Sequence, residues 1–165
     1  MNLPTRKPPR LKNYDYSSPG MYFITICVKD RKSLLGEIVG GGDFDTPKMM
    51  LSEYGKILDK YIGLLNKKYS HIKTDKYIIM PNHFHLILCI TDYKNGASET
   101  AAPYNSEISK FVSLLKRHCN REYGKNIWQR SFHDHIIRDE NDYRTIWEYV
   151  DTNPEKWQQD CFYTK

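Results

Sequence analysis

Two histidines that stand one residue apart are the first candidates for chemistry in this chain. His83 and His85 open an apolar run, residues 83–90, that is typical of a buried strand. On a strand, residues i and i+2 point to the same face, so the two imidazoles project side by side while Phe84 faces the other way. Two aligned imidazoles can bind one metal ion, but a further ligand must come from elsewhere. A pair of hydrogen-bonded core histidines, or a structural metal site, is the alternative interpretation.

A second candidate pair lies near the end of the chain, where Tyr149 and Asn153 are four residues apart. The segment 142–152 predicts an amphipathic helix whose apolar stripe is formed by Tyr143, Ile146, Trp147 and Val150. Tyr149 and Asn153 project side by side from the flank of that stripe. Tyr143 fits a core aromatic residue. Tyr149 could equally be a half-buried tyrosine whose hydroxyl is hydrogen-bonded.

The elements that must position these side chains predict an α+β fold. Apolar and β-branched runs indicate strands at 21–28, 72–80, 83–90 and about 132–138, and apolar periodicity indicates helices from about 51 to 65, from 106 to 123 and from 142 to 152. Pro81 and Asn82 form the turn of a hairpin, Ser106 is a plausible N-cap, and Gly40 to Gly42 suggest a flexible hairpin or loop. This order predicts a ferredoxin-like sandwich, with an antiparallel sheet, helices on one face and an added C-terminal helix that carries the tyrosine. We expect a basic extended arm at 1–20 and a single domain at 21–165.

The charge of the chain favours an anionic partner. Its net charge is +5 and its pI is about 8.9. The predicted arm combines prolines with Arg6, Lys7, Arg10 and Lys12, and the helix at 106–123 carries Lys110, Lys116, Arg117 and Arg121. Either set could contact a nucleic-acid backbone, or could simply be solvated.

The location of the protein is predicted from what the sequence lacks. The longest apolar runs fall short of the roughly 18–20 residues of a membrane span, and the charged N-terminus is not that of a secretory signal. The four cysteines include no Cys-x-x-Cys pair, and Cys27 and Cys89 fall in predicted buried strands, which suits reduced thiols. We therefore expect a cytoplasmic protein without a membrane partner.

Three motifs in order resemble those of one family. Residues 80–85 (MPNHFH), residues 128–138 (WQRSFHDHIIR), and residues 142–144 and 149–154 (DYR and YVDTNP) are similar to the REP-associated tyrosine transposases. These are relatives of the single-tyrosine HUH transposases of bacterial insertion sequences, and the resemblance runs from about Tyr14 to Trp157.

The resemblance implies a function and a set of site residues. His83, His85 and Asn153 would bind a divalent metal ion, Mg²⁺ or Mn²⁺, and Tyr149 would be the nucleophile. Tyr149 would cleave and rejoin single-stranded DNA beside palindromic hairpins through a 5′-phosphotyrosine link. Arg130, Phe132 and His135 match a further family element whose roles the resemblance does not assign. The resemblance also implies that DNA contacts the basic residues of the arm and a second set, which is Lys116, Arg117, Arg121, Arg130, His135 and Arg138.

Other functions remain open at the level of sequence. A histidine-triad nucleotide hydrolase is not one of them, because it would need a third histidine at position 87, where this chain has Ile87. A relaxase or replication initiator shares the HUH chemistry, although such proteins are usually larger. A domesticated protein that binds hairpin DNA without cleaving it would keep the same fold. The relatives work as monomers or as homodimers, and the sequence does not choose between these states.

Overall fold

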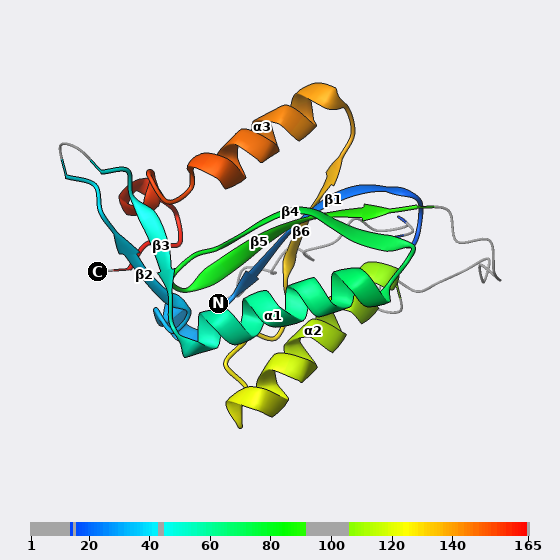
Figure 1. Cartoon of the computed structure of the whole chain (residues 1–165). Coiled ribbons are helices and arrows are strands. Elements are labelled where there is room, and N and C mark those ends of the chain that lie inside the picture. The colour runs from blue at the N-terminus through cyan, green and yellow to red at the C-terminus, as the bar shows by residue number, and fades with distance from the viewer. Residues whose placement is uncertain (1–13, 15, 43–44, 92–105, 165) are drawn as a thin grey trace, which may run out of the picture.

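The computed structural model describes residues 14, 16–42, 45–91 and 106–164. In chain order, the elements are β1 (Gly20–Cys27), the 3₁₀ turn η1 (Lys29–Arg31), β2 (Gly36–Val39), β3 (Lys48–Leu51), α1 (Glu53–Lys68), β4 (Ile72–Ile79), β5 (His83–Ile90), α2 (Glu107–Tyr123), β6 (His133–Ile137), α3 (Glu140–Thr152) and the 3₁₀ turn η3 (Trp157–Gln159). The predicted α+β sandwich is confirmed. Figure 1 shows α1 and α2 on one side of the sheet and α3 on the other.

The main sheet has four strands in the order β4-β5-β1-β6, and all three pairings are antiparallel. β1 and β5 are therefore the central strands, which explains why both sequences are apolar on two faces. The predicted hairpin at Pro81 and Asn82 joins β4 to β5, so the two histidines do begin a strand. A β-bulge between Thr74 and Lys76 interrupts the register of β4 at Asp75.

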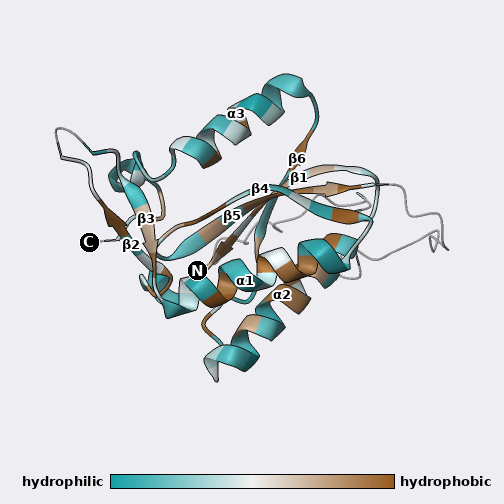
Figure 2. Ribbon diagram, viewed as in Figure 1, coloured by the Kyte–Doolittle hydropathy of each residue, from teal (hydrophilic) through white to brown (hydrophobic). Residues whose placement is uncertain are grey.

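A large apolar core lies between the sheet and the helices α1 and α2. Phe84 and Leu86 on β5 face this core and are fully buried, as are Leu58 of α1 and Leu115 of α2. Figure 2 shows apolar and polar stretches alternating along the ribbons of these two helices, as amphipathic helices require. Both helices have N-caps from serine, because Ser52 accepts from the amide of Gly55 and Ser106 accepts from that of Ser109. The prediction for Ser106 is thus confirmed.

A smaller apolar cluster packs α3 onto the opposite face of the sheet. Ile87 of β5 meets Ile146 and Val150 of α3 there. Asp139 caps the helix by accepting from the amide of Asp142, so α3 starts before the predicted residue 142. The prediction that Trp147 belongs to the core stripe is wrong. Its side chain is 39% exposed, and the Lys76 ammonium lies 3.0 Å from the centre of its ring.

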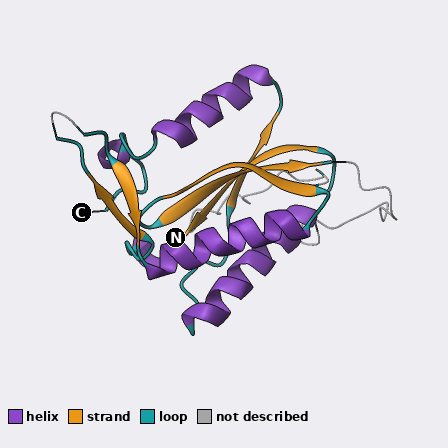
Figure 3. Cartoon of the chain, viewed as in Figure 1, coloured by secondary structure: helices purple, strands orange, loops and turns teal. Residues whose placement is uncertain are grey.

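The β2 and β3 strands form a separate two-stranded sheet, drawn in orange apart from the main sheet in Figure 3. Gly40 to Gly42 lie in the connection between these strands, as a hairpin requires. Residues 1–13 of the predicted arm lie outside the described residues. Just before β1, the ring of Tyr16 packs into the core. No helix in the described ranges combines the length and the apolar character needed to cross a membrane.

Candidate active site

β5 brings the two histidines together beneath α3. His83 and His85 sit opposite Cys27 and Thr25 of β1 in the register, and their side chains are almost completely buried. Their Nε2 atoms lie 3.0 Å apart. The alternation predicted from the sequence therefore places both imidazoles on one face, which is the face that α3 covers.

Hydrogen bonds at the other ring nitrogen orient each imidazole. The Nδ1 atom of His83 lies 2.9 Å from Oδ1 of Asn82, and Nδ1 of His85 lies 2.8 Å from the hydroxyl of Thr25. Burial lowers the pKa of His83 to about 4, an effect that the Asp160 carboxylate partly offsets. Burial, and then the charge of His83, hold the pKa of His85 well below its usual value. Both rings are thus neutral near neutral pH, as metal ligands must be.

α3 places Tyr149 directly over this pair. The Tyr149 hydroxyl lies 3.4 Å from Nε2 of His85, and the tyrosine ring packs edge-on against the rings of His85 and Phe23. The residue is still 37% exposed, so an incoming molecule can reach it. Burial and the nearby Asp160 carboxylate raise the pKa of Tyr149 to about 12. The phenol is therefore protonated and a weak nucleophile unless a positive charge comes close to it.

Asn153 follows one turn later, as its spacing predicted. Its side chain is 3% exposed. A hydrogen bond from its amide to Tyr149 partly offsets the rise in the pKa of the phenol. Among the described residues, however, Oδ1 of Asn153 is buried without a hydrogen-bond partner. A buried carbonyl oxygen without a partner is costly, and a cation would satisfy it. The amide oxygen therefore fits a metal ligand.

A fourth candidate ligand, the carboxylate of Asp160, lies outside every pattern that predicted the other three. This residue follows η3, and its side chain is 3% exposed. Its Oδ2 accepts from the Tyr149 hydroxyl at 3.3 Å and lies 3.9 Å from Nε2 of His83, while its Oδ1 accepts from the amide of Phe162 at 2.7 Å. Ligand atoms of His83, His85 and Asp160 all lie within 4.8 Å of one another, so the three could hold a metal ion.

Asp160 escaped prediction because the segment that carries it is irregular. It is a short turn after the helix, in which Trp157 and Phe162 pack their rings near the His83 imidazole, at centroid distances of 5.9 and 4.6 Å. A turn of this kind has no periodic pattern that would place one carboxylate beside a distant strand. The aromatic residues on either side of Asp160 were the only signal that this segment is buried.

The expected DNA contacts are divided between the two faces of the molecule. Arg117 and Arg121 are exposed on α2, a helix that Figure 1 shows on the side of the sheet away from α3. Lys116 is half-buried, and its ammonium donates to the carbonyls of Gln129 and Ser131, both at 2.9 Å. Burial lowers the pKa of Lys116 to about 8. These bonds give Lys116 a structural role, which joins α2 to the segment before β6.

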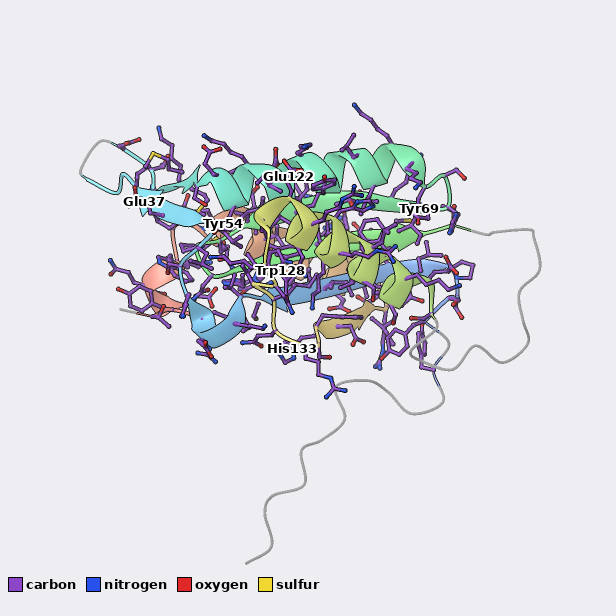
Figure 4. All side chains as sticks on the ribbon, turned by 90° about the horizontal axis from the view of Figure 1, so that it is seen from below. Glu37, Tyr54, Tyr69, Glu122, Trp128 and His133 are labelled. Atoms are coloured by element: carbon purple, nitrogen blue, oxygen red, sulfur yellow. The ribbon has the colours of Figure 1, made fainter. Side chains whose placement is uncertain are left out.

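The remaining expected contacts follow the β6 edge. Arg130, His135 and Arg138 are exposed in or beside β6, and Figure 4 shows the neighbouring His133 at the margin of the molecule. Nε2 of His135 lies 2.8 Å from the carboxylate of Asp142, a residue in the first turn of α3. His135 therefore also joins the edge strand to the helix that carries the tyrosine. Arg6, Lys7, Arg10 and Lys12 lie outside the described residues.

An antiparallel sheet with two buried histidines facing a tyrosine on a separate helix is the arrangement that the resemblance to the tyrosine transposases implies. The chain is 33% identical to an uncharacterised protein of Haemophilus influenzae, over 96% of this chain and 93% of that protein. It is 23% identical to the REP-associated tyrosine transposase of Escherichia coli, over 86% of this chain and 70% of the relative. No family model matches the chain.

A solved structure shares the fold. It is that of a REP-associated tyrosine transposase bound to a REP hairpin, which aligns with a TM-score of 0.65 and 22% identity over 90% of this chain and 74% of its own. At this identity the structure supports the fold alone. Two relatives that match most of this chain carry the name of this family, one of them as a putative member, and the chain belongs to the family of the REP-associated tyrosine transposases.

Proposed function

We propose that this protein is a metal-dependent transposase that cleaves and rejoins single-stranded DNA beside hairpins. The observation that carries the proposal is the meeting of Tyr149 with the histidine pair, because its hydroxyl lies 3.4 Å from Nε2 of His85. One relative, 23% identical to this chain, is a REP-associated tyrosine transposase, and a solved structure with the same fold is that of such a transposase bound to a REP hairpin. Hairpin DNA is therefore the substrate we assign to this chain.

His83, His85, Asn153 and Asp160 would hold a divalent metal ion, which we take to be Mg²⁺ or Mn²⁺. Two neutral imidazoles, an amide oxygen without another partner and a carboxylate form a mixed nitrogen and oxygen set that suits these ions. When bound, the ion would polarise the scissile phosphate and neutralise its charge. It would also offset the negative charge of Asp160, which is one of the causes of the raised pKa of Tyr149.

In the reaction that we propose, Tyr149 carries the covalent step. Its phenolic oxygen attacks the phosphorus while the bond from phosphorus to the 3′ oxygen breaks, which leaves a 5′-phosphotyrosine and a free 3′-hydroxyl. Asp160 lies 3.3 Å from the hydroxyl and is the nearest carboxylate that can accept its proton. Because the phosphotyrosine conserves the phosphodiester energy, a 3′-hydroxyl can attack it in turn and rejoin the strands.

The test is an adduct assay with 5′-labelled and 3′-labelled single-stranded hairpin DNA in Mn²⁺. Wild type should form a denaturant-resistant adduct that disappears on chelation, and Tyr149→Phe should form none. The matched control is Tyr143→Phe, which removes a hydroxyl from the same helix where it donates to Asp75 at 2.8 Å. If Tyr149→Phe still forms the adduct and Tyr143→Phe does not, then Tyr143 is the nucleophile and the proposed role of Tyr149 is wrong. Tight hairpin binding by wild type with no adduct would favour the binding protein without cleavage.

A further inference from the structure

The first imidazole of the pair has a fixed proton position. The amide nitrogen of Asn82 donates to the carbonyls of Arg31 at 3.1 Å and Phe162 at 2.8 Å, which fixes the orientation of the amide and turns its oxygen toward His83. A carbonyl oxygen can only accept, so Nδ1 of His83 must carry the hydrogen. A neutral imidazole has one N–H, and therefore Nε2 of His83 is unprotonated and carries a lone pair.

The second imidazole has a different kind of partner. Nδ1 of His85 meets the hydroxyl of Thr25 at 2.8 Å, and a hydroxyl can either donate or accept. The other ring nitrogen of His85, Nε2, lies 3.0 Å from Nε2 of His83, which is unprotonated and carries a lone pair. That contact is favourable without a metal ion only if Nε2 of His85 carries a hydrogen. Nδ1 of His85 is then the acceptor, and Thr25 must donate to it.

We propose that Thr25 is a positioning residue that lets His85 exchange its tautomer when the metal ion binds. In the metal-free protein, His85 donates from Nε2 to His83 and accepts from Thr25. In the metal-bound protein, His85 donates from Nδ1 to Thr25, and both Nε2 lone pairs are free for the ion. His83 keeps one tautomer throughout. The identity of the ion rests on the proposed function, but the metal-free half of the inference does not.

The exchange balances without any change of charge. Solvent takes the proton from Nε2 of His85 and returns one to Nδ1, so the ring stays neutral, and the Thr25 hydroxyl turns from donor to acceptor. A residue that only accepts would leave two lone pairs facing each other at 3.0 Å in the metal-free site. A residue that only donates would oppose metal binding. Thr25 is 5% exposed, so little room remains for water to replace its hydroxyl.

The experiment is nitrogen NMR of the full chain labelled at histidine, which reports which ring nitrogen carries the hydrogen. Zn²⁺ serves as a diamagnetic probe of the metal site. In wild type without metal, we expect hydrogen on Nδ1 of His83 and on Nε2 of His85. After Zn²⁺ is added, both residues should carry it on Nδ1. His85 with hydrogen on Nδ1 before any metal is added would overturn the inference, as would a His85 that does not change when Zn²⁺ binds.

Two variants of Thr25 separate its hydroxyl from its shape. Thr25→Val keeps the branched side chain and should weaken Zn²⁺ and Mn²⁺ binding by about 10- to 100-fold, the usual effect of removing a partner of a metal-bound histidine. Thr25→Ser restores the hydroxyl and should bind within a few-fold of wild type. Equal affinity in Thr25→Val and wild type would overturn the role of the hydroxyl. A wild type that binds neither ion would instead overturn the metal site of the proposed function, so the two failures can be distinguished.

Discussion

The two faces of the main sheet are built for different purposes. The face under α1 and α2 is filled by a continuous apolar cluster that includes Phe84 and Leu86. The face under α3 has a small apolar cluster around Ile87, next to the buried polar groups His83 and His85. One strand, β5, supplies both faces by simple alternation. On this strand, therefore, residues that stabilise the main core alternate one by one with residues on the face of the candidate site.

The largest expected effect measures this separation directly. Leu86 and Ile87 are neighbours on β5, both fully buried, and they point to opposite faces. Leu86→Ala should cost about 3–5 kcal/mol in the free energy of unfolding, and Ile87→Ala about 2–3 kcal/mol, because the smaller cluster can collapse more easily around the cavity. Urea denaturation measures both values. Equal losses would mean that the α3 face contributes as much to the fold as the main core.

Acid should destabilise the polar face. Because the pKa of His83 falls from 6.5 to about 4 on folding, the unfolded chain binds more protons than the folded chain between these values. The contribution of His83 to stability is therefore complete above pH 6.5 and is lost as the pH falls toward 4. It amounts to about 3 kcal/mol at most. Denaturation curves at several pH values should show a smaller acid loss in His83→Gln. The exposed His133→Gln controls for the removal of an imidazole, and an unchanged slope in His83→Gln would contradict the prediction.

Removing the carboxylate of Asp160 should change both the metal affinity of the site and the pKa of Tyr149. Asp160→Asn should weaken Mn²⁺ binding about tenfold or more, measured by calorimetry. The pKa of Tyr149 should fall below about 12 but stay above 10, because burial is the larger cause of its rise. Ultraviolet titration of tyrosinate, with Tyr149→Phe as the blank, measures this pKa. Unchanged Mn²⁺ affinity would remove Asp160 from the proposed ligand set.

The smallest effect decides which face meets the DNA backbone. Arg138 lies between β6 and the tyrosine helix, whereas Arg117 is exposed on α2, away from the site. Arg138→Gln should weaken hairpin binding a few-fold and reduce the salt dependence by about one phosphate contact, and Arg117→Gln should have less effect. Fluorescence anisotropy at several salt concentrations gives both quantities. The reverse order would place the DNA along α2.

The sequence predicted what depends on local periodicity. A spacing of two residues predicts the strand that carries His83 and His85, and a spacing of four predicts how Tyr149 and Asn153 lie on their helix. The N-cap at Ser106 follows from a serine directly before the apolar periodicity begins. Such patterns cannot predict contacts that depend on where a chain segment turns back. Asp160 reaches the site because of the turn after α3.

Two further residues show the same limit on α2 and α3. Helical spacing groups Lys116 with the exposed cations of its helix, but its ammonium donates to neighbouring carbonyls. Trp147 has the spacing of a core residue, but the side chain of Lys76 meets its ring on the outside. Residue type and spacing give the direction in which a side chain leaves the backbone, and the tertiary partner decides where its end lies.

The β-bulge at Asp75 has a consequence for changes in chain length. The extra residue interrupts the register of β4 between Thr74 and Lys76, and its carboxylate accepts from the hydroxyl of Tyr143 on α3. Loss of this one codon would leave β4 with a regular ladder while removing a point of attachment of the tyrosine helix. At this position, therefore, an insertion or deletion can alter the attachment of the helix that carries Tyr149 while leaving the helix's own sequence unchanged.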